Sequence, residues 1–257
     1  MPNITDFGHY FVYYMKTIIK ALVAGIIFAA IVTISLVYYF KKENKENLTR
    51  KQKTKKMAMV SILSAFSVVL YFLGFPLPFF VSFLDVQFSN LPVYLASFMF
   101  GPVEGIVVSL IRTLIKIPFT KTMCVGELQD LIISITISCI SGIVYFKNKT
   151  RKGALLALVI ASLSWVLIAL LSNVFISVPF YIKFMFGGNN EVLVNMIKAV
   201  IPNTTSENYL MNYLLLSCLP FNILLSSVVS LITFLVYKRT SILFKKFIYK
   251  DDMQGDI

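Results

Sequence analysis

Residues 91–117 are LPVYLASFMFGPVEGIVVSLIRTLIKI, and the way in which this apolar stretch crosses a membrane decides the fold of the chain. As a single helix it would be about 40 Å long, well above a hydrocarbon core of about 30 Å. Gly101-Pro102 lies near its middle, where proline and glycine can interrupt a helix. The stretch therefore crosses either once, as an overlong helix, or twice, as two short helices.

The basic residues distinguish these alternatives, because loops on the cytoplasmic side of a membrane collect Lys and Arg. The linker 41–56 is dense in both, which places it inside. Clusters at 147–152 and 238–250 indicate a second inside loop and an inside C-terminal tail. If residues 91–117 crossed once, the 147–152 cluster would lie outside. We therefore predict two short helices, broken at Gly101-Pro102, with the turn facing the cytoplasm.

The composition indicates an integral membrane protein of the cell membrane. A chain of 257 residues with 58% hydrophobic and 14% charged residues cannot hide its apolar surface in a water-soluble core. The net charge of +12 is explained by anionic lipid near the basic loops, so no nucleic-acid role is expected. The polar start Met1–Tyr10 indicates no cleaved signal peptide. The three cysteines show no paired spacing, so we expect neither a disulfide nor a metal site.

The remaining apolar stretches complete an all-α bundle of six core helices plus one extra N-terminal transmembrane helix. Further spans are expected at Ala21–Phe40, Met57–Leu73, Val125–Phe146, Gly153–Ile182 and Tyr209–Tyr237. An outer loop, 184–207, carries a short amphipathic helix at Val192–Val200. We divide the chain into an N-terminal segment with the extra helix (1–40), a basic cytoplasmic linker (41–56), a six-helix substrate-binding domain (57–247) and a cytoplasmic tail (248–257).

The loop after the first core helix carries Phe75-Pro-Leu-Pro-Phe-Phe80 and contains no Lys or Arg. Its prolines hold the chain extended and keep the neighbouring aromatic side chains presented. We predict a water-facing lid beside a pocket, in which Phe79 and Phe88 offer π faces to a ligand.

Polar side chains inside the predicted spans gather toward the outer side. They are Arg112, Glu127, Asp130, Asn173 and Asn222. Because polar groups inside a membrane normally face the bundle interior or a water-filled cavity, we expect an outward-opening binding cavity. Carboxamides and aromatic faces together suit a planar heterocycle with polar edges. In the alternative, Arg112 pairs structurally with Asp130 or Glu127, and the asparagines only join helices.

An enzyme is not expected, because the only histidine is His9 and no catalytic motif such as His-Glu-x-x-His is present. A carrier would need a partner for energy, since the chain has no phosphate-binding Gly-x-x-x-x-Gly-Lys-Ser/Thr loop. Ala58, Ser61 and Ala65 form a stripe of small residues on the first core helix. Such a stripe permits close helix approach, either within the bundle or to an external partner.

Several motifs, in order over about Met57–Phe247, resemble the riboflavin-binding S component of energy-coupling factor (ECF) vitamin transporters. They are Phe75-Pro-Leu-Pro-Phe-Phe, Asp85-x-x-Phe-Ser, Phe100-Gly-Pro, Val125-Gly-Glu-Leu, Lys149-Thr-Arg-Lys-Gly, Asn173-x-x-x-x-x-Pro-x-Tyr181, Pro220-Phe-Asn222 and Leu231-Ile-Thr-Phe-Leu-Val-Tyr-Lys-Arg.

The resemblance implies a subunit of a bacterial ABC-type importer that captures riboflavin outside the membrane, with no cofactor or catalysis of its own. It would associate with a transmembrane coupling subunit, facing Ala58, Ser61 and Ala65, and with two cytoplasmic ATPases. The first long loop, including Asp85, would contact the vitamin together with Asn173 and Asn222. The sequence departs from the family at Leu225, where a lysine usually approaches the flavin. The alternatives are an S component for another vitamin or heterocyclic precursor, and a passive channel or structural membrane protein.

Overall fold

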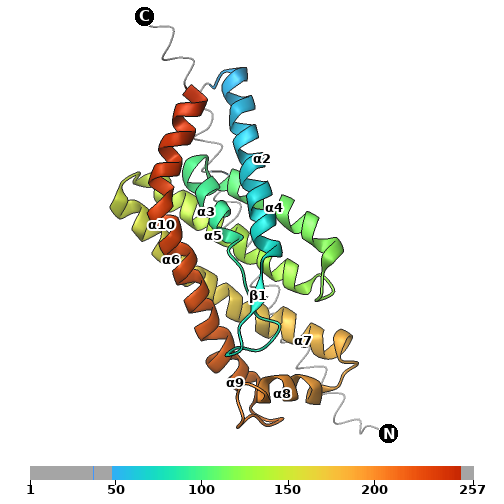
Figure 1. The fold of residues 1–257 in the computed structure, drawn as a ribbon. Helices are drawn as coiled ribbons and strands as arrows, with labels where there is room; N and C mark the ends of the chain where they lie inside the picture. The colour runs from blue at the N-terminus through green and yellow to red at the C-terminus, as the bar shows by residue number, and fades with distance from the viewer. Residues whose placement is uncertain (1–36, 38–47, 250–257) are drawn as a thin grey trace, which may run out of the picture.

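The computed structural model describes residue 37 and residues 48–249 of the chain. Except for Val37, the predicted span Ala21–Phe40 lies outside the described residues. The described part is an elongated helical bundle (Figure 1). Its elements are α2 (Arg50–Phe72), β1 (Phe75–Pro76), β2 (Asp85–Val86), α3 (Asn90–Met99), α4 (Pro102–Lys116), η1 (Ile117–Phe119), α5 (Val125–Lys147), α6 (Arg151–Ser172), η2 (Asn173–Ser177), α7 (Val178–Phe180), η3 (Tyr181–Met185), α8 (Asn190–Lys198), α9 (Tyr209–Tyr213), η4 (Leu214–Cys218) and α10 (Leu219–Tyr249).

Within residues 48–249, four helical segments are long and apolar enough to cross a membrane. They are Arg50–Phe72, Val125–Lys147, Arg151–Met185 and Tyr209–Ile248. Each contains or closely matches a predicted core span. Helices α3 and α4, with 10 and 15 residues, are the two short helices expected from residues 91–117.

The predicted break at Gly101-Pro102 is confirmed. Helix α3 ends at Met99 and α4 begins at Pro102. Gly101 has φ of 125°, a conformation that side chains with a Cβ rarely adopt, and Pro102 occupies the first turn of α4, where its missing N–H is tolerated. A Cβ on Gly105, one turn later, would overlap the hydroxyl groups of Ser97 and Ser138. Helix α4 therefore packs at close range against both α3 and α5.

Helix α2 begins earlier than the predicted Met57, because Thr49 caps it within the expected linker. The Thr49 hydroxyl accepts a hydrogen bond from the Gln52 amide at 3.3 Å, and Gln52 Oε1 accepts one from the Thr49 amide at 2.9 Å. This reciprocal pair satisfies amides that a helix start leaves without partners. The first two turns of α2 are therefore basic and helical.

The loop that follows α2, residues 73–89, is the lid loop. It folds back on itself as a two-stranded antiparallel sheet in which Phe75 pairs with Val86 and Pro76 with Asp85. The lid loop is fastened to the last helical segment, since the Val81 amide donates to Ser217 Oγ at 3.1 Å and Phe80 packs edge-on against Phe221. The sequence predicted the loop but not its strands.

The two longest predicted spans each contain π-helical turns. Segments η2 and η3 follow α6, and η4 joins α9 to α10. A π-helical turn holds an additional residue and often marks a functional site. The predicted outer helix Val192–Val200 is present as α8, which buries Leu193 and Ile197 against the bundle.

Candidate functional site

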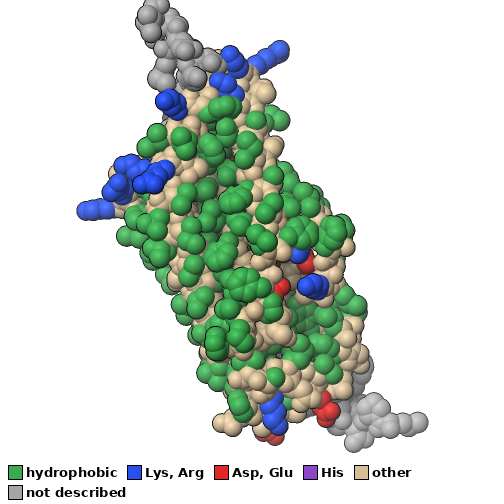
Figure 2. All heavy atoms as spheres, viewed as in Figure 1, with side chains coloured by type: hydrophobic (Ala, Val, Ile, Leu, Met, Phe, Trp, Pro, Cys, Tyr) green, Lys and Arg blue, Asp and Glu red, His purple; other side chains and the backbone are tan. Residues whose placement is uncertain are grey.

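A cavity of about 160 Å³ lies between the lid loop and helices α2, α5, α6 and α10. It is lined by Tyr71, Phe72, Gly74, Phe83, Leu84, Asp85, Gln87, Lys116, Phe119, Lys121, Thr122, Gly126, Glu127, Gln129, Asp130, Ile133, Trp165, Asn173, Tyr181, Phe221, Asn222 and Leu225. Figure 2 shows a hollow on the right of the molecule where acidic and basic side chains gather on an otherwise apolar face. Five of the predicted ligand-binding residues line the cavity, namely Asp85, Glu127, Asp130, Asn173 and Asn222.

Two buried asparagine amides form the deep end of the cavity. Asn173 Oδ1 accepts from the Tyr213 hydroxyl at 2.6 Å, and its Nδ2 donates to the Ala169 carbonyl at 2.8 Å. Asn222 Oδ1 accepts from Trp165 Nε1 at 3.0 Å, and its Nδ2 donates to the Cys218 carbonyl at 2.8 Å. A carboxamide offers two N–H donors and two acceptor lone pairs. Both amides also donate to Cys218 Sγ, so each is oriented by the protein and keeps one acceptor lone pair of its Oδ1 for a ligand.

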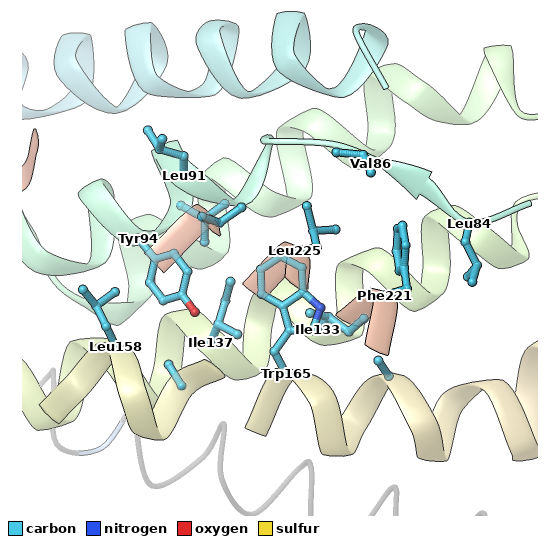
Figure 3. Close-up of a cluster of buried hydrophobic side chains, with 14 of the residues drawn as sticks. Leu84, Val86, Leu91, Tyr94, Ile133, Ile137, Leu158, Trp165, Phe221 and Leu225 are labelled. Carbon is cyan, nitrogen blue, oxygen red and sulfur yellow. The ribbon is translucent and has the colours of Figure 1, made fainter. Parts of the chain in front are cut away.

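The walls around these amides are apolar and aromatic. Trp165, Phe221, Leu225 and Ile133 are all buried, and the first three come from facing helices α6 and α10. In Figure 3 the Trp165 ring lies beside Leu225 and Ile133. Aromatic and aliphatic surfaces with a few directed polar groups are typical of a pocket for a flat heterocycle.

The mouth of the cavity is charged. Glu127 Oε2 accepts from the hydroxyls of Thr120 and Thr122 at 2.7 and 2.9 Å. The Lys116 ammonium lies 4.2 Å from the centre of the Phe72 ring, while Asp85 is exposed. A ligand that enters here meets carboxylates and amines before it reaches the amides.

Asp130 joins three parts of the molecule at the side of the cavity. Its Oδ2 accepts from the Tyr71 hydroxyl at 2.7 Å and from Gln87 Nε2 at 2.5 Å. Tyr71 belongs to α2, Gln87 to the lid loop and Asp130 to α5. One carboxylate oxygen therefore connects the lid loop to two helices.

Arg112, predicted to face the cavity, lies behind its wall. The side chain is fully buried and donates to Ser89 Oγ at 2.5 Å, to Asn90 Oδ1 at 2.8 Å and to Ser134 Oγ. It lies there because the end of the lid loop and the start of α3 fold over α4. The sequence gives no signal for this position.

The two predicted aromatic contacts also lie away from the cavity lining. The Phe79 side chain is 76% exposed at the tip of the lid loop, and Phe88 packs partly buried against the apolar core. The lid loop instead contributes Phe83, Leu84 and Gln87 to the cavity, which the sequence interpretation did not single out. The sequence did contain one signal for the deep wall of the cavity. Trp165 is the single tryptophan of the chain, and it lies in the middle of a predicted span.

A family model and two known transporters relate this chain to the same group of membrane proteins. The family model for the ECF transporter, substrate-specific component, matches residues 55–237. The riboflavin transporter RibU of Staphylococcus aureus (strain TCH60) is 29% identical over 195 residues, which cover 76% of this chain and 95% of that protein. The riboflavin transporter FmnP of Bacillus subtilis (strain 168) is 23% identical over 188 residues, which cover 72% and 91%.

A solved structure described as "Structure and mechanism of the S component of a bacterial ECF transporter" has a similar fold. It superimposes with a TM-score of 0.57 at 27% identity and covers 75% of this chain and 99% of that chain. Nearly all of that chain is therefore matched by about three quarters of this one.

Proposed function

Because this chain belongs to the family of ECF transporter substrate-specific components, we propose that it captures riboflavin at the outer face of the cell membrane and passes it to an ATPase-driven coupling module. It acts as a binding subunit, with no cofactor and no catalysis of its own. The family assignment and the relatives that are riboflavin transporters support this function. A passive channel has no comparable support.

The observation that carries the proposal is the pair of oriented amides, Asn173 and Asn222, between aromatic walls. A flavin ring is flat, and the N–H group on its polar edge can donate to the acceptor lone pair that each carboxamide oxygen keeps free. Its polyhydroxylated chain would then point to the mouth, where Glu127 and Asp130 can accept hydrogen bonds from hydroxyl groups.

Binding of a ligand of this size requires the lid loop to move. The cavity of about 160 Å³ is smaller than the roughly 300–1,000 Å³ of pockets for comparable ligands. The lid loop is joined to the bundle by hydrogen bonds at Val81 and Gln87 and by ring contacts of Phe80 and Phe83. We therefore propose that these contacts open to admit the vitamin.

A ligand-release experiment tests the function. Protein purified from riboflavin-fed cells should carry a yellow ligand that heating releases and that mass spectrometry identifies as riboflavin. Added riboflavin should bind the ligand-free protein saturably, with quenching of flavin fluorescence. Colourless protein that leaves flavin fluorescence unchanged would exclude riboflavin.

A second candidate ligand, another heterocyclic vitamin or precursor, is favoured by Leu225. This buried leucine lines the cavity where the family resemblance leads us to expect a lysine beside the flavin. The same release experiment distinguishes the two, because it identifies whichever compound the cells supply.

The proposed contact with the transmembrane coupling subunit is on α2. Ala58, Ser61 and Ala65 are exposed on one face of this helix. Larger apolar side chains, among them Ile62 and Phe66, are exposed beside them. An exposed face of small residues flanked by apolar side chains suits close packing of a second transmembrane helix.

The proposed orientation has the C-terminus in the cytoplasm. Lys55 of α2 donates to the carbonyl of Ile248 near the end of α10 at 3.5 Å, so these two helix ends lie on the same side of the membrane. Basic side chains gather at this end (Figure 2). Their concentration supports a cytoplasmic location.

A further inference from the structure

Arg112 is connected to the cavity by a continuous chain of hydrogen bonds. It donates to Ser89 Oγ at 2.5 Å, and the Ser89 hydroxyl donates to Gln87 Oε1 at 2.7 Å. The Gln87 amide then donates to Asp130 Oδ2 at 2.5 Å. Every bond in the chain points in the same direction, from the guanidinium to the carboxylate. Hydrogen bonds arranged in this way polarise and strengthen one another.

The members of the chain differ in their access to a ligand. Arg112 and Ser89 are fully buried and do not line the cavity, whereas Gln87 and Asp130 do. The first two can therefore influence a bound ligand only indirectly, and the hydrogen bonds lead through the last two. Ser89 is further held by α2, because the Ser67 hydroxyl donates to its carbonyl at 2.6 Å.

Gln87 is the residue on which the chain depends. Its carbonyl oxygen accepts from a hydroxyl while its amide donates to a carboxylate, a combination that neither glutamate nor an aliphatic side chain provides. It lies in the last part of the lid loop, one residue beyond β2. Residues that keep the Gln87 side chain in place therefore also hold the end of the lid loop against Asp130.

We propose that Arg112 and Ser89 are positioning residues which act through Gln87 to keep the lid loop fastened at the Asp130 carboxylate. This inference rests on the proposed function, since it makes the fastening a determinant of how fast riboflavin leaves. It also explains why a charged side chain is buried inside the bundle without facing the ligand.

The test uses the full-length protein in lipid nanodiscs and two matched pairs of variants. Gln87→Glu keeps the size of the side chain but removes its donor and brings a second carboxylate to Asp130. Gln52→Glu is its control, because Gln52 lies outside the cavity lining and its Oε1 accepts a hydrogen bond from the Thr49 amide, which glutamate can also do. Ser89→Ala breaks the chain outside the cavity. Its control is Ser109→Ala, at an equally buried serine of α4 that donates only to the Gly105 carbonyl.

Two quantities are measured, the hydrogen exchange of residues 75–88 without ligand and the rate of riboflavin dissociation. We expect Gln87→Glu and Ser89→Ala to accelerate both by about tenfold, while the two controls behave as the parent protein does. Combining Ser89→Ala with Gln87→Glu should add little, because the two variants break the same chain.

Equal exchange and dissociation rates in Ser89→Ala and Ser109→Ala would overturn the proposal, as would faster exchange with unchanged dissociation. If the parent protein does not bind riboflavin, the proposed function fails. The exchange rates then decide separately whether the chain fastens the lid loop.

Discussion

Asn173 and Asn222 direct their side-chain amide nitrogens at the same atom, Cys218 Sγ, at distances of 3.4 and 3.5 Å. The two asparagines belong to different helical segments, and the sulfur atom lies at the end of the π-helical turn η4. The orientation of one amide is therefore linked to that of the other. Substitution of Asn173, Asn222 or Cys218 should therefore disturb the same group of contacts at the deep end of the cavity.

Replacing either asparagine with alanine should weaken riboflavin binding about ten- to hundredfold. Each substitution removes ligand contacts and leaves a buried donor, Tyr213 Oη or Trp165 Nε1, without its acceptor. Titration with flavin fluorescence measures the dissociation constant. Asn212→Ala is the control, because Asn212 lies outside the cavity lining and bonds only to Thr204 and Asn208. An effect as large as this in the control would argue against the assigned site.

Cys218→Ala should weaken binding about three- to tenfold, because both amides lose a shared contact. Cys218→Ser should retain most of the affinity, since a hydroxyl can accept from the same two nitrogens. Cys139→Ala is matched in chemistry and burial but lies away from the cavity lining. The prediction fails if the two alanine variants have the same dissociation constant for riboflavin.

Trp165 should report ligand binding by itself. It is the single tryptophan of the chain and lines the deep end of the cavity, so all indole fluorescence comes from this site. A bound flavin absorbs in the range of indole emission and should quench most of it in a saturable manner. In Trp165→Phe the indole signal disappears, and flavin fluorescence should then show weaker binding because Asn222 loses a donor. Unchanged indole emission at saturating riboflavin would place the ligand elsewhere.

Ser61→Phe and Ala65→Phe should abolish copurification with the coupling subunit while riboflavin still binds to the isolated protein. Both positions are exposed on α2, where a large side chain prevents close helix approach without disturbing the cavity. Leu155→Phe enlarges an exposed side chain on α6 and should leave the complex intact. Copurification of the intact complex with both α2 variants would contradict the proposed surface.

Gly105→Ala should lower the stability of the fold by about 1–3 kcal/mol, the usual effect of overpacking. The added methyl group would overlap the hydroxyls of Ser97 and Ser138 and force α4 away from its neighbours. Thermal unfolding in detergent measures the loss. Gly74→Ala serves as the comparison, because its Cβ would meet no atom closer than 3.5 Å. Equal melting temperatures for the two variants would be incompatible with the tight crossing.

Within residues 48–249, the sequence was sufficient to predict the long helices, because apolar stretches and clusters of basic residues can be read directly from it. Charge distribution and the Gly101-Pro102 pair led to the two short helices, and the structure confirms that break. The cavity was predicted in part, since the depth of Asn173 and Asn222 along their helices can be counted from the ends of the apolar stretches.

The remaining features depend on contacts between distant residues. The position of Arg112 is determined by how the lid loop and α3 fold over α4, and the strands of the lid loop form only once its two ends meet. The π-helical turns likewise have no characteristic amino-acid composition from which they could be predicted. Hydropathy gives the depth of a residue in the membrane, but such contacts determine which way it faces.

The π-helical turn η4 lies directly before α10, so the number of residues in this turn sets the angular register of α10. Each residue advances an α-helix by about 100°, so deletion of one residue between 214 and 218 would rotate one side of the turn by that angle relative to the other. Asn222 and Leu225 would then turn away from the cavity and other residues of α10 would face it, while the loops on both sides kept their lengths. A single-codon insertion or deletion is therefore a route by which such a scaffold could acquire a different cargo.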